Sequence, residues 1–368
     1  MSILYDEGQQ AIATESRRVL DARMDKARLL ALLEQVGQHD AAFWDTAVEQ
    51  GWTALAIPEE HGGLGLGLIE LGLVAQACGA ATSGAPFLTG GYGLSQALVH
   101  SSDAALAAEW LPKLASGELT GCVAFAEGNA ALPPKPTVTY ANGALDGVKP
   151  AVPGGCAADV ALVWALSDSG VVLVAADLAG ASRKPVDSYD NSRLYADLTF
   201  AGTPATLIAS GDAARALALD VLGRMAVVTA HEQVGGAEAL LYIARDYALT
   251  RKAFGQPIGA FQSIKHRIAE MYGFVEVARA NCIHAAASAD NLGGTDAFLT
   301  AAADARISAT EAYDTNSRDC VQIHGGIGVT WELGLHLHMR RARSLAVECG
   351  NLVFWEDLLV DRLAGEVA

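Results

Sequence analysis

The stretch Tyr247–Met271 reads YALTRKAFGQPIGAFQSIKHRIAEM, and it holds a sharp break between two helical patterns. Apolar residues at helical spacing precede the break: Leu240, Leu241, Ile243, Ala244 and Ala248. Pro257 lacks a backbone donor and disfavours helix at Gln256, so the first helix must end near Gly255. We expect a second helix to begin after Gly259.

Side chains suited to a ligand gather at this break. We place Arg251 and Lys252 on the last turn of the first helix, with Phe254 and Gln262 on either side of the break. A cation, an aromatic face and an amide at one corner suit a ligand that carries a phosphate and a flat ring. The alternative is a capped corner, in which the two cations satisfy carbonyl groups at the end of the helix.

Three motifs of the chain resemble the acyl-CoA dehydrogenase family. The pattern R-x-x-F-G-x-P-I-x-x-F-Q spans Arg251–Gln262, QIHGGIG spans Gln322–Gly328, and PEEHGGLG spans Pro58–Gly65. They occur in the family's order over most of the chain. The resemblance implies an α+β, mainly α fold with an N-terminal α-domain, a middle β-domain and a C-terminal four-helix bundle, and it implies FAD as cofactor.

The hydrophobic pattern divides the chain into predicted domains at 1–120, 121–209 and 210–368. Helical patterns in the first are Asp21–Val36, Phe43–Gln50, Leu68–Cys78 and Ala104–Leu114. Strand patterns in the second are Gly121–Phe125, Thr137–Tyr140, Val160–Ala165, Val171–Ala175 and Leu194–Phe200, with Pro204 closing the segment. The third domain contains the predicted helices Ala213–Ala248, Ser263–Ala287, Thr295–Gln322 and Glu332 to the C-terminal region. Short loops predict an antiparallel bundle, and its apolar faces predict contacts with other subunits.

Composition bounds the class of protein. Of 368 residues, 51% are hydrophobic and 18% are charged, which favours a globular, helix-rich chain. The net charge of −17 argues against binding to nucleic acid or to an anionic membrane. The glycine-rich turn at Pro58–Gly65 is expected to join helices, because no strand precedes it and no Lys follows it as in a phosphate loop.

Cysteine spacing and hydropathy indicate the compartment. The six cysteines form no C-x-x-C pair, so we expect reduced thiols in a cytoplasm, with no disulfide frame and no metal site. The opening MSILYDEGQQ lacks the basic and apolar regions of a secretory signal. No apolar run reaches the 18 residues of a membrane span, and the most apolar segment, Val160–Ala179, is interrupted at Ser167, Asp168 and Ser169. We therefore expect a cytoplasmic protein.

The QIHGGIG motif has two interpretations. Adjacent glycines after a long helix let the backbone approach a ligand, and amides at such a break can hold a pyrophosphate. The alternative is a glycine C-cap. The resemblance implies contact with the adenosine-pyrophosphate half of an FAD bound mainly to a neighbouring subunit, with Arg251 paired to the pyrophosphate. The predicted cofactor-binding residues are Arg251, Phe254, Gln262, Gln322, Gly325 and Gly326. For His324 we expect a structural or backbone-bonding role.

The flavin-ring half of the family site departs from the family pattern. Where the family has T-E-P-G-A-G-S-D, residues Ala126–Pro133 read AEGNAALP, so the Thr is replaced by Ala126. Where the family has N-G-x-K-x-W-I-T-N, residues Asp146–Gly154 read DGVKPAVPG, with Ala151 at the ring-stacking aromatic and Pro153 at the Thr. An alanine and a proline cannot supply those contacts.

The catalytic base is also missing from its two usual family positions. They correspond here to Cys349 and Met225, neither of which is a carboxylate. Glu348 is adjacent to the first position, but one residue on a helix turns the side chain by about 100°. Asp220 and Glu232 are weaker candidates, expected to be surface or capping residues. We assign no catalytic residue in this chain.

This asymmetry resembles the non-catalytic subunit of heterotetrameric (α2β2) acyl-CoA dehydrogenases that act on sterol or bile-acid side chains. The implied partners are a homologous catalytic subunit, an acyl-CoA substrate and an electron-transfer flavoprotein. Two alternatives remain. One is a self-sufficient homo-oligomeric dehydrogenase that uses Glu348 or another carboxylate. The other is a flavin-free scaffold or CoA-binding module.

Overall fold

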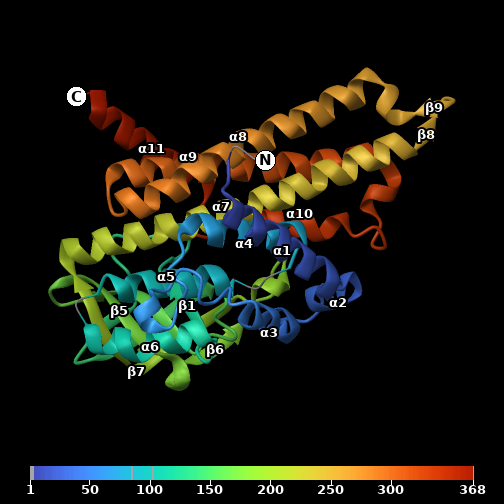
Figure 1. The fold of residues 1–368 in the computed structure, drawn as a ribbon. Coiled ribbons are helices and arrows are strands. Elements are labelled where there is room, and N and C mark those ends of the chain that lie inside the picture. Colours follow the sequence, from blue (N-terminus) through green and yellow to red (C-terminus); the bar gives the residue numbers. More distant parts are fainter. Residues whose placement is uncertain (1–3, 84–85, 102, 368) are drawn as a thin grey trace.

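The chain folds into an N-terminal helical region, a β-sheet region and a bundle of long helices (Figure 1). The computed structural model describes residues 4–83, 86–101 and 103–367. In Figure 1 the bundle lies across the top, and the sheet and N-terminal helices lie below it. This arrangement confirms the predicted α+β, mainly α fold. Among the described helices, none combines the length and apolarity that a membrane span requires.

The N-terminal region is built from helices that pack against the bundle and the sheet. They are α1 (Glu7–Arg23), α2 (Lys26–Leu33), α3 (Ala41–Glu49), α4 (Leu68–Ala80), α5 (Phe87–Val99) and α6 (Ala104–Ser116). The predicted helix Asp21–Val36 is wrong, because α1 ends at Arg23 and the Asp25 side chain caps a new helix. Helix α5 was not predicted, since Gly90, Gly91 and Gly93 lower its helix propensity and it forms by packing on the sheet.

Two glycines allow this region to pack closely against the bundle. A Cβ on Gly79 of α4 would lie 1.8 Å from the carbonyl oxygen of Glu232, in α7 (Gly211–Thr250). A Cβ on Gly235 would lie 1.9 Å from the carbonyl oxygen of Gln76. The two helices therefore touch backbone to backbone. The PEEHGGLG turn before α4 is a helix-joining turn, as predicted, and a Cβ on its Gly63 would lie 1.9 Å from the Ile57 carbonyl oxygen.

The middle region is a sheet that closes on itself. Its strands are β1 (Gly121–Ala124), β2 (Thr139–Ala141), β3 (Ala144–Val152), β4 (Val160–Ser167), β5 (Gly170–Asp177), β6 (Ser182–Pro185) and β7 (Ala196–Ser210). The pairings β4–β5–β7–β3–β2–β4 complete a ring. Strands β3 and β6 were not predicted, and Pro204 does not end the last strand. It lies where β7 changes its partner from β3 to β5, a point at which the missing proline donor costs little.

The bundle consists of α7, α8 (Gln262–Leu292), α9 (Asp296–His324), α10 (Leu335–Leu345) and α11 (Leu352–Val367). Helix α7 packs against α8 and α9, and α9 packs against α11. The predicted fourth helix from Glu332 is two helices. The chain breaks between them because Cys349 and Gly350 adopt positive φ angles of 54° and 93°.

Candidate functional site

The corner after α7 is a short hairpin. Helix α7 ends at Thr250, Arg251 is its C-cap with extended backbone, and Lys252 lies in β8 (Lys252–Ala253), which pairs with β9 (Gln256–Pro257). The prediction that both cations lie on the last helical turn is therefore wrong. The extended backbone at Arg251 allows its carbonyl oxygen to accept from the Ile258 amide, which closes the hairpin. We call residues 251–262 the hairpin corner.

The predicted ligand-binding side chains of the hairpin corner are exposed. Phe254 is 95% exposed at a φ of 52°, and its ring packs edge to face with Phe261 at 6.2 Å between centroids. Arg251, Lys252 and Gln262 are also exposed. Within the described residues, the Arg251 and Lys252 side chains form no hydrogen bond or ion pair, so they do not cap the carbonyl groups of α7. Both cations are free to meet an anion from outside.

The QIHGGIG motif ends α9 with a glycine C-cap. The Gly325 amide donates to the carbonyl oxygens of Val321 and Gln322, so this amide is not available to a phosphate. Gly325 adopts φ 60° and ψ −140°, a conformation that favours glycine. A Cβ on Gly325 or Gly326 would meet nothing within 4 Å, and the Gln322 side chain is exposed. The motif thus presents an open surface onto which a ligand could lie closely.

A stacked pair of rings joins the two motifs. The imidazole of His324 stacks on Tyr247 with 4.1 Å between ring centroids. Its Nδ1 hydrogen-bonds the Cys320 carbonyl oxygen at 2.8 Å, which is the backbone-bonding role expected of this histidine. Tyr247 lies one turn before Arg251, so the end of α9 and the hairpin corner are held at the same end of the bundle (Figure 1).

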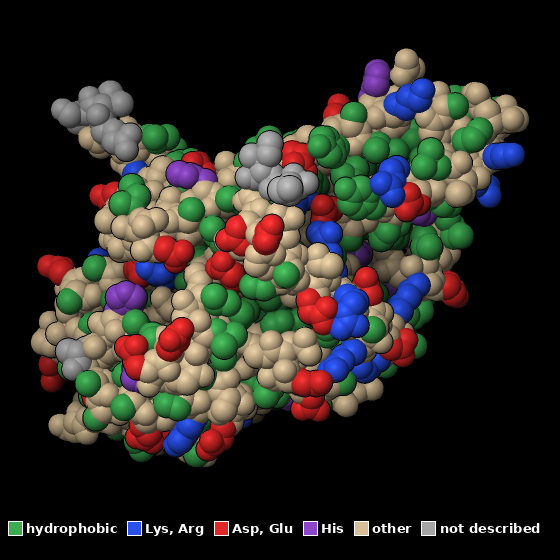
Figure 2. Space-filling view, viewed as in Figure 1, with side chains coloured by type: hydrophobic (Ala, Val, Ile, Leu, Met, Phe, Trp, Pro, Cys, Tyr) green, Lys and Arg blue, Asp and Glu red, His purple; other side chains and the backbone are tan. Residues whose placement is uncertain are grey.

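Hydrophobic side chains surround this end of the bundle. Tyr242, Leu249 and Tyr272 are exposed by 42%, 63% and 54% respectively. Figure 2 shows hydrophobic side chains gathered on the bundle surface next to the hairpin corner. Exposed apolar groups beside unpaired cations are typical of a surface that meets another protein and a charged ligand.

The segments expected to face a flavin ring are held in place, but Ala126 and Ala151 offer only methyl groups there. The buried Lys149 ammonium donates to the Phe125 carbonyl oxygen at 3.1 Å and to the Glu127 carboxylate at 2.6 Å. Burial lowers the pKa of Lys149 to about 8. These bonds fix Ala126 beside β3, where Ala151 is also exposed. Neither residue offers an aromatic face or a hydroxyl group.

The two usual base positions hold no carboxylate and no ionised group. Burial, and then the neighbouring Glu348, raise the pKa of the Cys349 thiol to about 11, so it is protonated at neutral pH. The Thr229 hydroxyl donates to its sulfur at 3.7 Å. Met225, at the other position, is buried.

Glu348 is held in a buried ion pair. Its side chain is 2% exposed, and it accepts from Arg193 Nη2 at 2.6 Å and from Arg193 Nε at 3.0 Å. The Tyr195 hydroxyl donates to the same carboxylate, and burial followed by the Glu348 charge raises the pKa of Tyr195 well above its ordinary value. A carboxylate with three donors already on it is poorly placed to remove a proton from a substrate.

The two weaker candidates are also paired and buried, not at the surface. Glu232 accepts from Arg341 Nη1 at 2.6 Å. Asp220 accepts from Arg224 Nε at 2.8 Å and from the Gly294 amide at 2.6 Å, so it caps a loop. Sequence reasoning missed the arginine partners because each ion pair except Asp220–Arg224 joins residues far apart in the chain.

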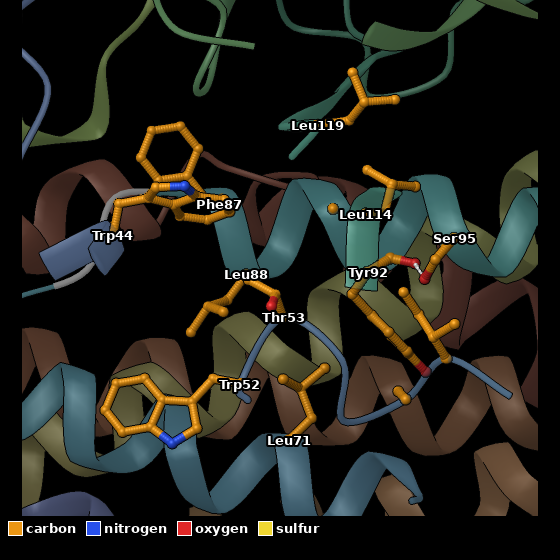
Figure 3. A pocket seen from close by; sticks show the side chains of 14 residues that line it. Trp44, Trp52, Thr53, Leu71, Phe87, Leu88, Tyr92, Ser95, Leu114 and Leu119 are labelled. Carbon is orange, nitrogen blue, oxygen red and sulfur yellow. Dashed lines mark hydrogen bonds between the residues drawn. The ribbon is translucent and has the colours of Figure 1, made fainter. Parts of the chain in front are cut away.

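A small cavity lies inside the N-terminal region, between α3, α4, α5 and α6 (Figure 3). Its free volume is about 30 Å³, and its walls include Trp44, Trp52, Phe87 and Tyr92. Its hydroxyl groups bond within the chain; the Thr53 hydroxyl, for example, donates to a backbone carbonyl oxygen. The space suits about one water molecule and no acyl chain.

Comparison with known proteins places the chain in a family. A family model described as the acyl-CoA dehydrogenase C-terminal domain matches residues 215–352, and one described as the N-terminal domain matches residues 6–118. The acyl-CoA dehydrogenase IpdE2 of Mycobacterium tuberculosis is 32% identical, with 84% of this chain and 82% of the relative covered.

Solved structures share the fold. A variant of the Tcur3481-Tcur3483 steroid ACAD matches with a TM-score of 0.87 and 26% identity, covering 98% of this chain and 99% of that one. The ChsE4-ChsE5 complex from Mycobacterium tuberculosis matches with a TM-score of 0.88 and 23% identity, covering 99% of each chain. The motifs, the fold and these matches agree, and the chain belongs to the acyl-CoA dehydrogenase family.

Proposed function

We propose that this chain is the non-catalytic subunit of a heterotetrameric acyl-CoA dehydrogenase. It lends the adenosine-pyrophosphate half of an FAD site to a homologous catalytic partner. The partner supplies the base, the contacts to the flavin ring and most of the CoA pocket. The reaction is α,β-dehydrogenation of an acyl-CoA, and the electrons pass to an electron-transfer flavoprotein.

The observation that carries this proposal is the contrast between two sets of residues. At the hairpin corner, Arg251 and Lys252 are exposed and unpaired within the described chain. On the flavin-ring side, Ala126 and Ala151 carry only methyl groups, and Cys349 is a protonated thiol. The phosphate half of the cofactor therefore fits the residues present, and the ring half does not.

Each residue proposed at the adenosine-pyrophosphate half of the FAD site has a physical role. The Arg251 guanidinium pairs with the pyrophosphate through charge-assisted hydrogen bonds. Phe254 offers an exposed aromatic face, and Gln262 and Gln322 offer amides that bond polar groups of the adenosine half. The small residues Gly325 and Gly326 let the backbone lie close to it. When bound, FAD accepts the hydride that leaves the acyl Cβ.

Relatives support a steroid-type substrate and a second subunit. One solved structure with the same fold is named a steroid ACAD and carries the paired name Tcur3481-Tcur3483, and another is a ChsE4-ChsE5 complex. By analogy we propose that the acyl group is a steroid side-chain CoA ester, bound mainly by the partner subunit.

Co-expression with a homologous dehydrogenase, followed by native mass spectrometry and a flavin count, tests the proposal. We expect an α2β2 complex with two flavins. Four flavins per tetramer would contradict the proposed half-site. The chain expressed alone should turn over no acyl-CoA, whereas turnover would favour a self-sufficient homo-oligomer that uses Glu348 or another carboxylate. A complex without flavin absorbance would favour the scaffold or CoA-binding module.

A further inference from the structure

The three regions of the chain meet at a buried set of charges. Arg341 of α10 donates to Asp190, which lies in the loop before β7, and to Glu232 of α7, at 2.6 Å in each case. It also donates to the carbonyl oxygens of Thr82 and Ser83, which follow α4. One arginine therefore links the N-terminal helices, the sheet and the bundle.

A second arginine connects the sheet to the segment where the bundle breaks. Arg193 lies 3.4 Å from Glu232 and 2.6 Å from Glu348, and Tyr195 donates to Glu348 from the residue just before β7. We call Asp190, Arg193, Tyr195, Glu232, Arg341 and Glu348 the junction cluster. Its four best-buried members, Asp190, Arg193, Arg341 and Glu348, are each at most 4% exposed.

The segment that carries Glu348 is held from behind as well. The Arg306 guanidinium of α9 donates to the carbonyl oxygens of Leu345 and Glu348, and burial lowers its pKa to about 10, so it stays charged at neutral pH. Arg193 and Arg341 face the three carboxylates, whereas Arg306 is held by uncharged oxygen acceptors. Buried charges of this kind are stable only when they are paired or hydrogen-bonded.

We propose that the junction cluster seals this chain's own crevice between the sheet and the bundle. Direct bonds from residues 190–195 to Glu348 and Arg341 occupy the space in which a flavin ring and an acyl thioester would have to lie. The inference rests on the proposed function for the position of that crevice, because the family's base position, Cys349, is next to Glu348.

Distances support the seal. A flat ring held between two walls needs about 3.5 Å of separation on each of its faces. Here the carboxylate of one wall and the guanidinium of the other are 2.6 Å apart, with the charges buried. Entry of a ring would separate Arg193 from Glu348 and leave the buried Glu348 carboxylate without its cation, which is strongly unfavourable. This subunit's crevice is therefore closed by bonds that are present, in addition to lacking ring contacts.

Hydrogen–deuterium exchange on the flavin-loaded and flavin-stripped complex tests the seal. We expect exchange at residues 251–262 and 322–329 to rise on flavin removal. Exchange at residues 189–195 and 345–351 of this chain should change by less than about twofold, because no cofactor is held there. An increase at 189–195 and 345–351 that matches the increase at the hairpin corner would overturn the seal. A complex in which neither pair of segments responds would contradict the proposed function and leave the seal supported.

A pair of variants tests the sealed crevice and the proposed flavin-binding role of Arg251 separately in the same assay. Glu348→Gln weakens the cluster and should raise exchange at residues 189–195 by about tenfold or more, with flavin content unchanged. Arg251→Ala should lower flavin content and leave exchange at 189–195 unchanged. If Glu348→Gln loses flavin instead, Glu348 belongs to a working site and the seal is wrong. The milder Tyr195→Phe variant gives the same readout if Glu348→Gln does not fold.

Discussion

At the junction cluster Arg193 and Arg341 each face carboxylates inside the protein, whereas at the hairpin corner Arg251 and Lys252 are exposed without a partner in the described chain. Both groups of charges are attached to the same helix, since Glu232 lies within α7 and Arg251 follows its end. The difference shows where the chain has completed its own interactions and where it leaves them for another molecule.

This contrast separates stability from binding in a testable way. Removal of a paired, buried charge leaves its partner uncompensated and should destabilise the fold. Removal of an exposed, unpaired charge should hardly affect the fold and should instead weaken whatever binds there.

The largest effect is expected for Arg341→Leu. This change leaves Asp190 buried without its ion-pair partner and leaves Glu232 with only the more distant Arg193, so the free energy of unfolding should fall by about 3–5 kcal/mol. Urea unfolding followed by circular dichroism measures it. The matched change Arg251→Leu should alter the free energy of unfolding by less than about 0.5 kcal/mol. Equal losses in the two variants would contradict the contrast.

Acid should destabilise the fold through two buried histidines that lie outside the hairpin corner. Burial, and then Arg341, lower the pKa of His338 to about 3, and burial lowers the pKa of His231 to about 4. The pKa of a histidine in the unfolded chain is about 6.5. As the pH falls below this value, the unfolded chain binds protons that the folded chain does not. Stability is complete above that pH and is lost as the pH falls to about 4, by up to about 3 kcal/mol for each histidine.

Unfolding measured at several pH values between 7.5 and 4.5 checks this expectation. The pH dependence should be shallower in His338→Gln, which removes one of the two histidines with the largest pKa shifts, and unchanged in Arg251→Leu. Burial opposes ionisation of Asp190, but Arg341 and Ser192 lower the pKa of this carboxyl below its ordinary value. A further loss of stability is therefore expected below about pH 4. A flat profile down to pH 4.5 would show that the histidines are not buried neutral.

A smaller effect is expected on flavin binding in Arg251→Ala. Loss of a charge-assisted contact should cost about 1.5–3 kcal/mol, which is about a 10- to 100-fold increase in the flavin dissociation constant of the complex. The control is Arg245→Ala near the same end of α7, because Arg245 is exposed but already paired with Asp246. Flavin fluorescence during dilution or dialysis gives both constants. Equal constants in the two variants would remove Arg251 from the site.

The smallest effect is expected for Tyr195→Phe. It deletes one donor to Glu348 and leaves both bonds from Arg193, so unfolding should become easier by about 1 kcal/mol. Tyr189→Phe is the matched control, because Tyr189 is 74% exposed and lies in the same loop. If the two tyrosine variants unfold at the same urea concentration, the Tyr195 hydroxyl contributes nothing to the cluster.

Residues that act locally could be predicted from the sequence. The periodicity of α7, α8 and α9 and the strand patterns predicted the main elements, and the break at Pro257 located the hairpin corner. Helix α5 was missed because its glycines disfavour helix and only packing on β1 stabilises it. The end of the bundle was misread because the positive φ at Cys349 is not encoded by a glycine at that position.

The junction cluster could not be predicted because its bonds join distant parts of the chain. Arg193 and Glu348 are separated by 155 positions, and no spacing rule relates them. The motif led to Glu348 as a candidate base, but only the arrangement in space showed that its carboxylate is already bonded. Arg251 is the opposite case. The motif identified this residue, and the structure shows that within the described residues its side chain has no hydrogen-bond or ion-pair partner.

The unbroken length of α7 restricts which mutations such a subunit can accumulate in evolution. Forty residues at a rise of 1.5 Å give a rod of about 60 Å, and Glu232 and Arg251 lie about 28 Å apart along it. One inserted or deleted residue between them would swing everything beyond it by about 100° around the axis. Substitutions along the outer face of this rod should therefore be tolerated, whereas changes of length should be eliminated by selection.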